Sequence, residues 1–126
     1  MPFRSNAGAG RDGRPVIRLR LLADDLTGAL DSAAQFVPLV GAVPAFWHDA
    51  VPKRLPGSTA LDSGTREADS HFAAERVAAL APALAAADIA FKKIDSLLRG
   101  AAAAEIAACL RAGGFAACVI APAFPA

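Results

Sequence analysis

The chain has 126 residues, a formal net charge of +1 at pH 7 and a 55 % apolar composition. This length fits one domain, and the balanced charge, without a basic block among aromatic residues, argues against nucleic-acid binding. No apolar run approaches the roughly 20 residues that a membrane-spanning helix needs, so we expect no membrane partner.

The first residues differ in composition from the rest. Residues 1–14 are rich in Gly and Arg and lack the apolar centre of a secretory signal, so we expect a flexible tail before one domain over residues 15–126. Cys109 and Cys118 lack metal-ligand spacing, so we assign no metal ligand and expect two buried thiols in the reducing cytoplasm.

Strand and helix patterns alternate along the domain. Apolar runs and period-two alternation predict strands at about residues 16–23, 42–47, 59–61, 89–94 and 115–121. Helical periodicity predicts helices at about residues 28–36, 66–87 and 97–111, the first capped by Thr27 and the last by Asp95 or Ser96. The alternation predicts an α/β fold of three layers, with a mostly parallel, Rossmann-like sheet of about five strands and helices on both faces.

One stripe of apolar side chains in each longer helix should face the sheet. In the second predicted helix the stripe is Phe72, Val77, Leu80 and Leu84. In the third it is Leu98, Ala102, Ile106 and Cys109.

Two adjacent acids, Asp24 and Asp25, follow the first predicted strand and precede a helix. Adjacent carboxylates repel each other unless a cation lies nearby, and they suit binding of substrate hydroxyls, holding a metal, or accepting a proton. The alternative is a helix N-terminus stabilised by acids, an effect of about 0.3–1 kcal/mol. We favour a functional role for at least one, because the helix needs only one acid.

Asp62, Thr65 and Arg66 follow the third predicted strand. A guanidinium group suits a two-pronged contact with a carboxylate or phosphate. The alternative is a helix cap with a solvated Arg66, and the spacing favours neither interpretation.

Three cations, an acid and a hydroxyl follow or end the fourth predicted strand: Lys92, Lys93, Arg99, Asp95 and Ser96. Cations at a strand-to-helix turn suit an anionic ligand, because free backbone amides add to the attraction. The alternative is an ordinary amphipathic junction. We favour the anion site, although the sequence contains no glycine-rich loop of the kind that holds nucleotide phosphates.

Three stretches around these residues resemble the N-terminal domain of the four-carbon acid sugar kinases: residues 23–31 (ADDLTGALD), 62–66 (DSGTR) and 92–100 (KKIDSLLRG). Residues 120–125 (IAPAFP) look like the next motif of that family. The resemblance implies an ATP-dependent kinase of threonate-like or erythronate-like sugar acids, in which a separate C-terminal domain holds ATP and Mg²⁺. The chain would be the substrate-binding domain of such a kinase, incomplete at its C-terminal end.

The chemistry of the residues that match the family's motifs indicates a role for each in binding a four-carbon acid. Asp25 is the expected catalytic base, with Asp24 beside it as a second catalytic candidate. Cations would hold the ligand's carboxylate and acids its hydroxyls, each charge-assisted hydrogen bond contributing about 1.5–3 kcal/mol. The expected substrate-binding residues are Thr27, Asp62, Thr65, Arg66, Lys93, Asp95 and Arg99.

Two alternatives belong to other functional classes. A receiver-like phosphoacceptor domain also has an acidic pair after its first strand and an aspartate, here Asp62, after its third. A Pro-rich loop instead of a helix between the second and third strands argues against it. The other alternative is a non-catalytic or regulatory fragment that binds a small anion. We expect the chain alone to bind a sugar acid without transferring phosphate, and homo-oligomerisation is left open.

Overall fold

Strands and helices alternate in the computed structural model, which describes residues 13–47 and 50–122. The strands are β1 (Leu19–Ala23), β2 (Ala45–Trp47), β3 (Thr59–Asp62) and β4 (Ile89–Lys92). The helices are α1 (Leu26–Val40), α2 (Ser70–Ala85) and α3 (Ala102–Gly113). Residues 1–12 of the predicted tail and residues 123–125 of the motif at residues 120–125 lie outside the described residues.

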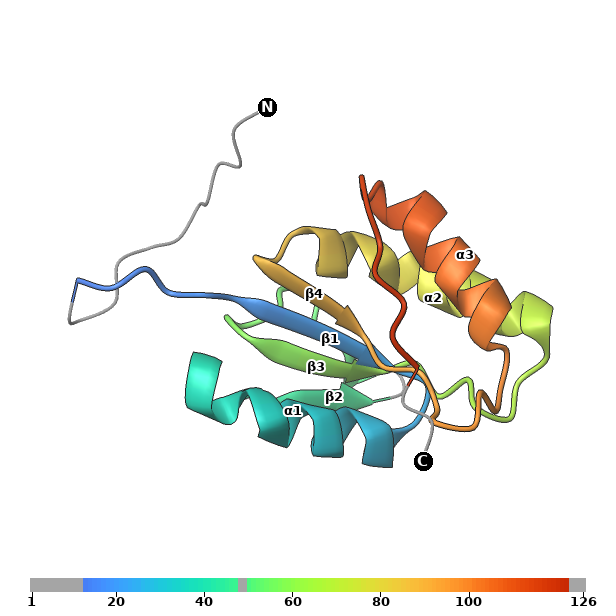
Figure 1. Cartoon of the computed structure of the whole chain (residues 1–126), viewed down its shortest axis with the longest axis horizontal. Coiled ribbons are helices and arrows are strands. Elements are labelled where there is room, and N and C mark those ends of the chain that lie inside the picture. Colours follow the sequence, from blue (N-terminus) through green and yellow to red (C-terminus); the bar gives the residue numbers. More distant parts are fainter. Residues whose placement is uncertain (1–12, 48–49, 123–126) are drawn as a thin grey trace.

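The strands form one sheet in the order β2-β3-β1-β4, and every neighbouring pair is parallel. Helix α1 covers one face, and α2 and α3 cover the other (Figure 1). The predicted α/β class is confirmed, with four strands in the described residues instead of about five. The order differs from that of a receiver domain, in which β1 lies between β2 and β3.

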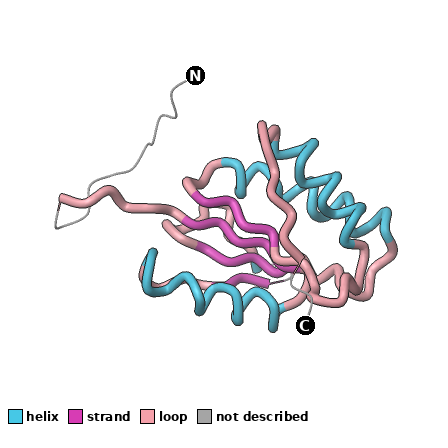
Figure 2. The backbone as a smooth tube through the Cα atoms, in the orientation of Figure 1, coloured by secondary structure: helices cyan, strands magenta, loops and turns pink. Residues whose placement is uncertain are grey.

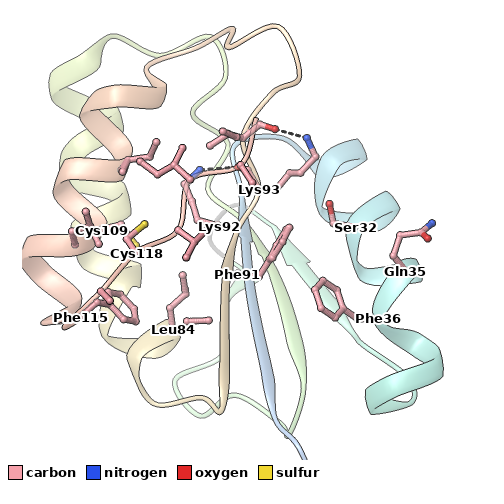
Figure 3. A pocket seen from close by; sticks show the side chains of 18 of the residues that line it. Ser32, Gln35, Phe36, Leu84, Phe91, Lys92, Lys93, Cys109, Phe115 and Cys118 are labelled. Atoms are coloured by element: carbon pink, nitrogen blue, oxygen red, sulfur yellow. Dashed lines mark hydrogen bonds between the residues drawn. The ribbon is translucent and has the colours of Figure 1, made fainter. Parts of the chain in front are cut away.

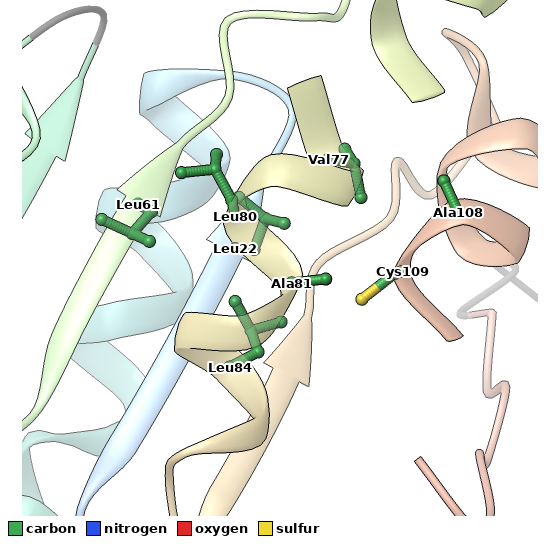
Figure 4. Packing of buried hydrophobic residues seen from close by; sticks show 8 residues of the cluster. All are labelled: Leu22, Leu61, Val77, Leu80, Ala81, Leu84, Ala108 and Cys109. Carbon is green, nitrogen blue, oxygen red and sulfur yellow. The ribbon is translucent and has the colours of Figure 1, made fainter. Parts of the chain in front are cut away.

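Two apolar clusters hold the layers together. On the α1 face, Leu19 and Leu21 of β1 pack with Ala29 and Ala33. On the other face Leu22 packs with side chains of β3, α2 and α3, as Figure 4 shows: Leu61, Val77, Leu80, Ala81, Leu84, Ala108 and Cys109. Every residue of β1 is buried, because helices cover this central strand on both sides.

Helix α1 begins and ends differently from its prediction. Its N-cap is Asp25, whose side chain accepts a hydrogen bond from the backbone N–H of Gly28, and the predicted cap, Thr27, lies exposed within the first turn. The helix continues past residue 36 to Val40 and includes Pro38. It stops at Gly41, which has a φ of 78°.

Helix α2 begins at Ser70, four residues later than predicted, because the side chain of Asp69 accepts hydrogen bonds from the backbone N–H groups of His71 and Phe72. Phe72 is 53 % exposed, so its predicted place in the core is wrong. The buried stripe begins instead at Ala73, which has the helical spacing to Val77 that Phe72 lacks.

Helix α3 also begins later than predicted, at Ala102, and no side chain caps it. The carboxylate of Asp95 accepts hydrogen bonds from the backbone N–H groups of Leu97 and Arg99, which holds residues 95–101 in a loop. Leu98 has a φ of 55° and is 45 % exposed, so its predicted inward orientation is wrong.

The predicted fifth strand does not form in the described structure. Residues 115–122 run beside the outer edge of β4 without strand pairing (Figure 2). A cavity of about 740 Å³ is lined by both segments, and Val119 is 92 % exposed. Cys118 is likewise exposed, contrary to its prediction, while Cys109 is buried, and neither thiol forms a disulfide. None of the described helices is long and apolar enough to cross a membrane.

Candidate functional site

The candidate residues meet at the carboxyl-end edge of the sheet. Parallel pairing sets Ala23 of β1 opposite Asp62 of β3, and Leu22 opposite Lys92 of β4. The chain leaves β1 toward α1 on one face, whereas it leaves β3 and β4 toward α2 and α3 on the other. Crevices form where neighbouring strands diverge in this way, and ligands of open α/β sheets bind there. We call the residues that follow β1, β3 and β4 at this edge the rim.

Arg66 contacts three acids of the rim. Its guanidinium group holds Asp24 with two hydrogen bonds, of 2.7 Å from Nε to Oδ2 and 2.8 Å from Nη2 to Oδ1. It also lies 3.4 Å from a carboxylate oxygen of Asp25 and 3.4 Å from one of Asp95. The hydrogen bonds to Asp24 raise the pKa of Arg66 above its already high usual value. One cation therefore ties together the loops that follow three neighbouring strands.

The two adjacent acids have different environments. Asp24 is 4 % exposed, and both of its carboxylate oxygens bond to Arg66. The Asp25 side chain is 33 % exposed, and its Oδ1 atom caps α1 through the N–H of Gly28 at 2.9 Å. Among the described residues, no hydrogen bond or ion pair engages Oδ2 of Asp25. Asp24 is thus an anchor for Arg66, and Asp25 is the acid of the pair that faces solvent.

Asp95 and Arg99 form a second two-pronged pair on the rim. Arg99 donates from Nε to Oδ2 at 3.0 Å and from Nη2 to Oδ1 at 2.8 Å. These bonds, with the backbone N–H groups of Leu97 and Arg99, hold the pKa of Asp95 well below its usual range. They also raise the pKa of Arg99, whose side chain remains 64 % exposed.

Lys93 lies on the α1 side of the rim. A Cβ atom built on Gly28 would be 3.6 Å from its Cγ atom, so the lysine stem passes beside the first turn of α1. Its Nζ atom donates to the backbone oxygen of Ile94 (Figure 3). Lys93 is half-buried, and it lines the cavity beside β4.

Three other predicted site residues lie at or beside the rim. Two of them are buried, and one is exposed. Asp62 is 4 % exposed and accepts a 2.7 Å hydrogen bond from the N–H of Gly64. Thr65 is fully buried, and its hydroxyl bonds to Ser63 and Glu105. Thr27 is exposed on α1 and, among the described residues, has no side-chain partner.

Sequence reasoning missed Glu105, a residue of α3 that is 1 % exposed. It accepts a hydrogen bond from the Thr65 hydroxyl and pairs with Lys92, whose Nζ atom lies 2.7 Å from Oε2. The available signal was a single carboxylate within an otherwise apolar stretch, residues 101–110. Such an acid is buried only when it is paired.

The cavity beside β4 is a different feature from the charged rim. Phe36, Phe91 and Phe115 line it together with Cys109, as Figure 3 shows. It reaches the rim at Lys93 and Ser96. The acids and arginines around Arg66 do not line it, so the charged cluster and this apolar hollow are neighbouring but separate.

Taken together, the rim offers cations and exposed acid oxygens within one small area. Such a set can bind a ligand that carries both an anionic group and hydroxyl groups. An α/β domain with this rim belongs to the class of small-ligand-binding domains that act at the carboxyl ends of parallel strands.

The family model described as "Sugar-binding N-terminal domain" matches residues 19–126, and the chain therefore belongs to this family. The resemblance to the N-terminal domain of sugar-acid kinases is confirmed. A D-threonate kinase of Cupriavidus necator is 38 % identical over 112 residues, covering 84 % of this chain and 26 % of that protein. A D-threonate kinase of Bordetella bronchiseptica is 40 % identical over 124 residues, covering 90 % of this chain and 30 % of that protein.

A crystal structure of a protein from Bordetella bronchiseptica, a domain-swapped dimer with bound citrate, has the same fold. It is 35 % identical with a TM-score of 0.63, and the match covers 75 % of this chain and 26 % of that one. The chain thus spans 30 % or less of the length of these relatives.

Proposed function

We propose that the chain is the substrate-binding domain of an ATP-dependent kinase of four-carbon sugar acids, and that D-threonate is its ligand. The observation that carries the proposal is the position of Arg66 between Asp24, Asp25 and Asp95, which brings three loops and their polar groups to one rim. The relatives named D-threonate kinase support the choice of ligand.

Arg99 and Lys93 hold the ligand's carboxylate. A guanidinium group has five N–H donors. The two hydrogen bonds to Asp95 use two of those of Arg99, whose side chain is 64 % exposed. Lys93 adds a second positive charge near the N-terminal turn of α1, where free amides also favour an anion. Arg66 is committed to Asp24 and contributes by holding the rim together.

Asp25 faces the ligand's hydroxyl groups and accepts the proton of the hydroxyl that is phosphorylated. A general base needs an accessible oxygen within hydrogen-bonding reach of that proton, and Asp25 is 33 % exposed, whereas Asp24 is buried. Asp62 lies near the same strand ends as a further acceptor. Thr65, being fully buried, acts through the loop that it holds and makes no contact with the ligand.

ATP and Mg²⁺ are not expected to bind mainly to these residues. Gly28 and Gly100 would let phosphate groups approach the backbone, but a Cβ built on each would lie 2.5 Å from Asp25 Oδ1 and 3.0 Å from Asp24 Oδ2. These carboxylates would repel a phosphate. Within the described residues, no group of three or more His, Cys, Asp or Glu side chains is arranged to hold a metal ion. We propose that a separate nucleotide-binding domain supplies both, and that the chain alone transfers no phosphate.

We also propose that this chain forms a homo-oligomer. The related Bordetella protein is a domain-swapped dimer, and β4 has one sheet edge without a strand partner in the described residues. A sedimentation measurement would distinguish a monomer from a dimer of this chain.

Titration calorimetry with D-threonate tests the proposed ligand. We expect binding by the unaltered chain and at least a tenfold weaker affinity for Arg99→Met, since a charge-assisted bond is worth about 1.5–3 kcal/mol. Arg54→Met, which removes an exposed arginine of the segment between β2 and β3, outside these motifs, is the matched control and should bind normally. A folded chain that gives no binding signal at millimolar D-threonate would contradict the proposal. ATP-dependent phosphorylation of D-threonate by the chain alone would contradict its inactivity.

A further inference from the structure

Glu105 connects α3 to the loop that presents Arg66. Its carboxylate, 1 % exposed, lies between the Thr65 hydroxyl and the Lys92 ammonium group, which is 2.7 Å from Oε2. Thr65 follows β3, Lys92 ends β4, and Glu105 belongs to α3. A single buried carboxylate therefore connects α3 with the end of β4 and with the loop that follows β3.

Two hydroxyl groups connect Glu105 to the end of β1. An ionised carboxylate only accepts hydrogen bonds, so Thr65 must donate its one hydroxyl proton to Glu105. The Ser63 hydroxyl lies 2.7 Å from Thr65 Oγ1 and 3.0 Å from the backbone oxygen of Ala23, to which it donates. Ser63 thus lies between Thr65 and the last residue of β1.

This buried network continues into the backbone of the rim. The N–H groups of Thr65 and Arg66 both donate to the backbone oxygen of Asp24 at 3.0 Å, and the N–H of Ser63 donates to that of Ala23 at 2.8 Å. These bonds fix residues 63–66 relative to the end of β1. The place of the Arg66 guanidinium group, and with it the arrangement of Asp24, Asp25 and Asp95, depends on that loop.

We propose that Glu105 is a positioning residue for the sugar-acid site, a role that rests on the function proposed above. It fixes the loop of residues 63–66 through Thr65, and Lys92 neutralises its charge. Burial of an ion pair costs desolvation, and apolar residues of similar volume often replace such a pair without loss of stability. The network therefore serves the geometry of the rim more than the stability of the fold.

Two double variants separate geometry from stability. Glu105→Leu with Lys92→Met replaces the pair by apolar groups and removes the acceptor of Thr65. Glu105→Gln with Lys92→Met is the matched control, since the Gln oxygen still accepts from Thr65 while no charge is left unpaired. Backbone hydrogen exchange of Thr65 and Arg66 reports on the loop without any ligand. Exchange of Leu98, whose N–H bonds to Asp95, provides an internal reference.

In the Leu–Met variant we expect a melting temperature close to that of the parent, with Thr65 and Arg66 exchanging at least about tenfold faster, the effect of losing one buried hydrogen bond to a charged group. Leu98 should keep its parental rate, and the Gln–Met variant should restore slow exchange. D-threonate affinity should fall by a similar factor in the Leu–Met variant alone.

Parental exchange rates at Thr65 and Arg66 in the Leu–Met variant would overturn the role of Glu105, whatever the ligand. A Leu–Met variant that fails to fold while the Gln–Met variant folds with fast exchange at these amides would overturn it as well. If the parent chain does not bind D-threonate but the exchange pattern is as expected, the ligand assignment fails and the positioning role stands.

Discussion

The guanidinium group of Arg66 forms a two-pronged pair with the carboxylate of Asp24. Hydrogen bonds of 2.7 and 2.8 Å join them, although 42 positions separate the two residues in sequence. Asp24 is buried, and the Arg66 side chain is only 16 % exposed. The pair therefore joins the loop after β1 to the loop after β3, and the more exposed Arg99 and Asp25 are left to meet a ligand.

Removal of Arg66 should destabilise the chain strongly. Arg66→Ala leaves the buried carboxylate of Asp24 without its cation, and breaking a buried pair in this way costs about 3–5 kcal/mol. Denaturant unfolding, followed by circular dichroism, measures the free energy of unfolding. Arg66→Lys keeps the charge but not the two-pronged contact, so its loss should be smaller. Equal stabilities of Arg66→Ala and the parent would show that the pair holds nothing together.

Gly100 is expected to be required for the position of Asp24. It has a φ of 80°, and an added Cβ would lie 3.0 Å from Asp24 Oδ2 and 3.3 Å from the backbone oxygen of Arg66. Gly114 has a similar φ of 65° but no atom within 4 Å of an added Cβ, which makes it the matched control. Gly114→Ala should cost about 1 kcal/mol from backbone strain alone, and Gly100→Ala clearly more. Equal unfolding free energies of the two variants would rule out the contact with Asp24.

Asp95 should make stability depend on pH in the acid range. Its hydrogen bonds from Arg99 and from two backbone N–H groups lower its folded-state pKa below the unfolded value of about 3.9. The folded chain then binds the proton less readily than the unfolded chain. The stabilisation is therefore fully present above about pH 4 and is lost as the pH falls toward the folded-state pKa.

The unfolding free energy of the parent and of Asp95→Asn, measured between about pH 2 and pH 7, checks this dependence. The difference between the two proteins should be largest near neutral pH and shrink on acidification. Asp69→Asn is a comparison at an exposed acid, whose pKa is also lowered, mainly by the backbone N–H of Phe72. A gap between parent and Asp95→Asn that stays constant with pH would contradict the assignment.

Much of the fold could be predicted from the sequence, because apolar runs and helical spacing mark parallel strands and covering helices directly. The errors lie where particular hydrogen bonds or the lack of a pairing partner override the local pattern. Residues 97–101 look helical, but the carboxylate of Asp95 accepts hydrogen bonds from nearby N–H groups and keeps them in a loop. Residues 115–121 look like a strand, but they do not pair with β4 in the described structure.

That the candidate residues lie near one edge of the sheet was predictable, whereas their contacts with one another were not. Placement of Asp24, Arg66 and Asp95 at strand ends followed from the parallel sheet alone. The sequence did not indicate which acid Arg66 would bind, because this depends on how deeply each loop is buried. Glu105 gave only a weak signal, since helix periodicity does not distinguish a buried acid from one on a solvated face.

Asp25 permits a direct separation of its structural and chemical roles. Its Oδ1 atom caps α1, so Asp25→Ala should cost about 1 kcal/mol of stability, whereas Asp25→Asn, also a good cap, should stay within about 0.5 kcal/mol of the parent. Thermal unfolding of this chain measures both. In an active kinase that contains this domain, both substitutions should lower turnover at least about 100-fold, because neither side chain accepts a proton as a general base. If such a kinase with Asp25→Asn kept full turnover, Asp25 would be a helix cap alone, and the base would have to be another acid of the rim.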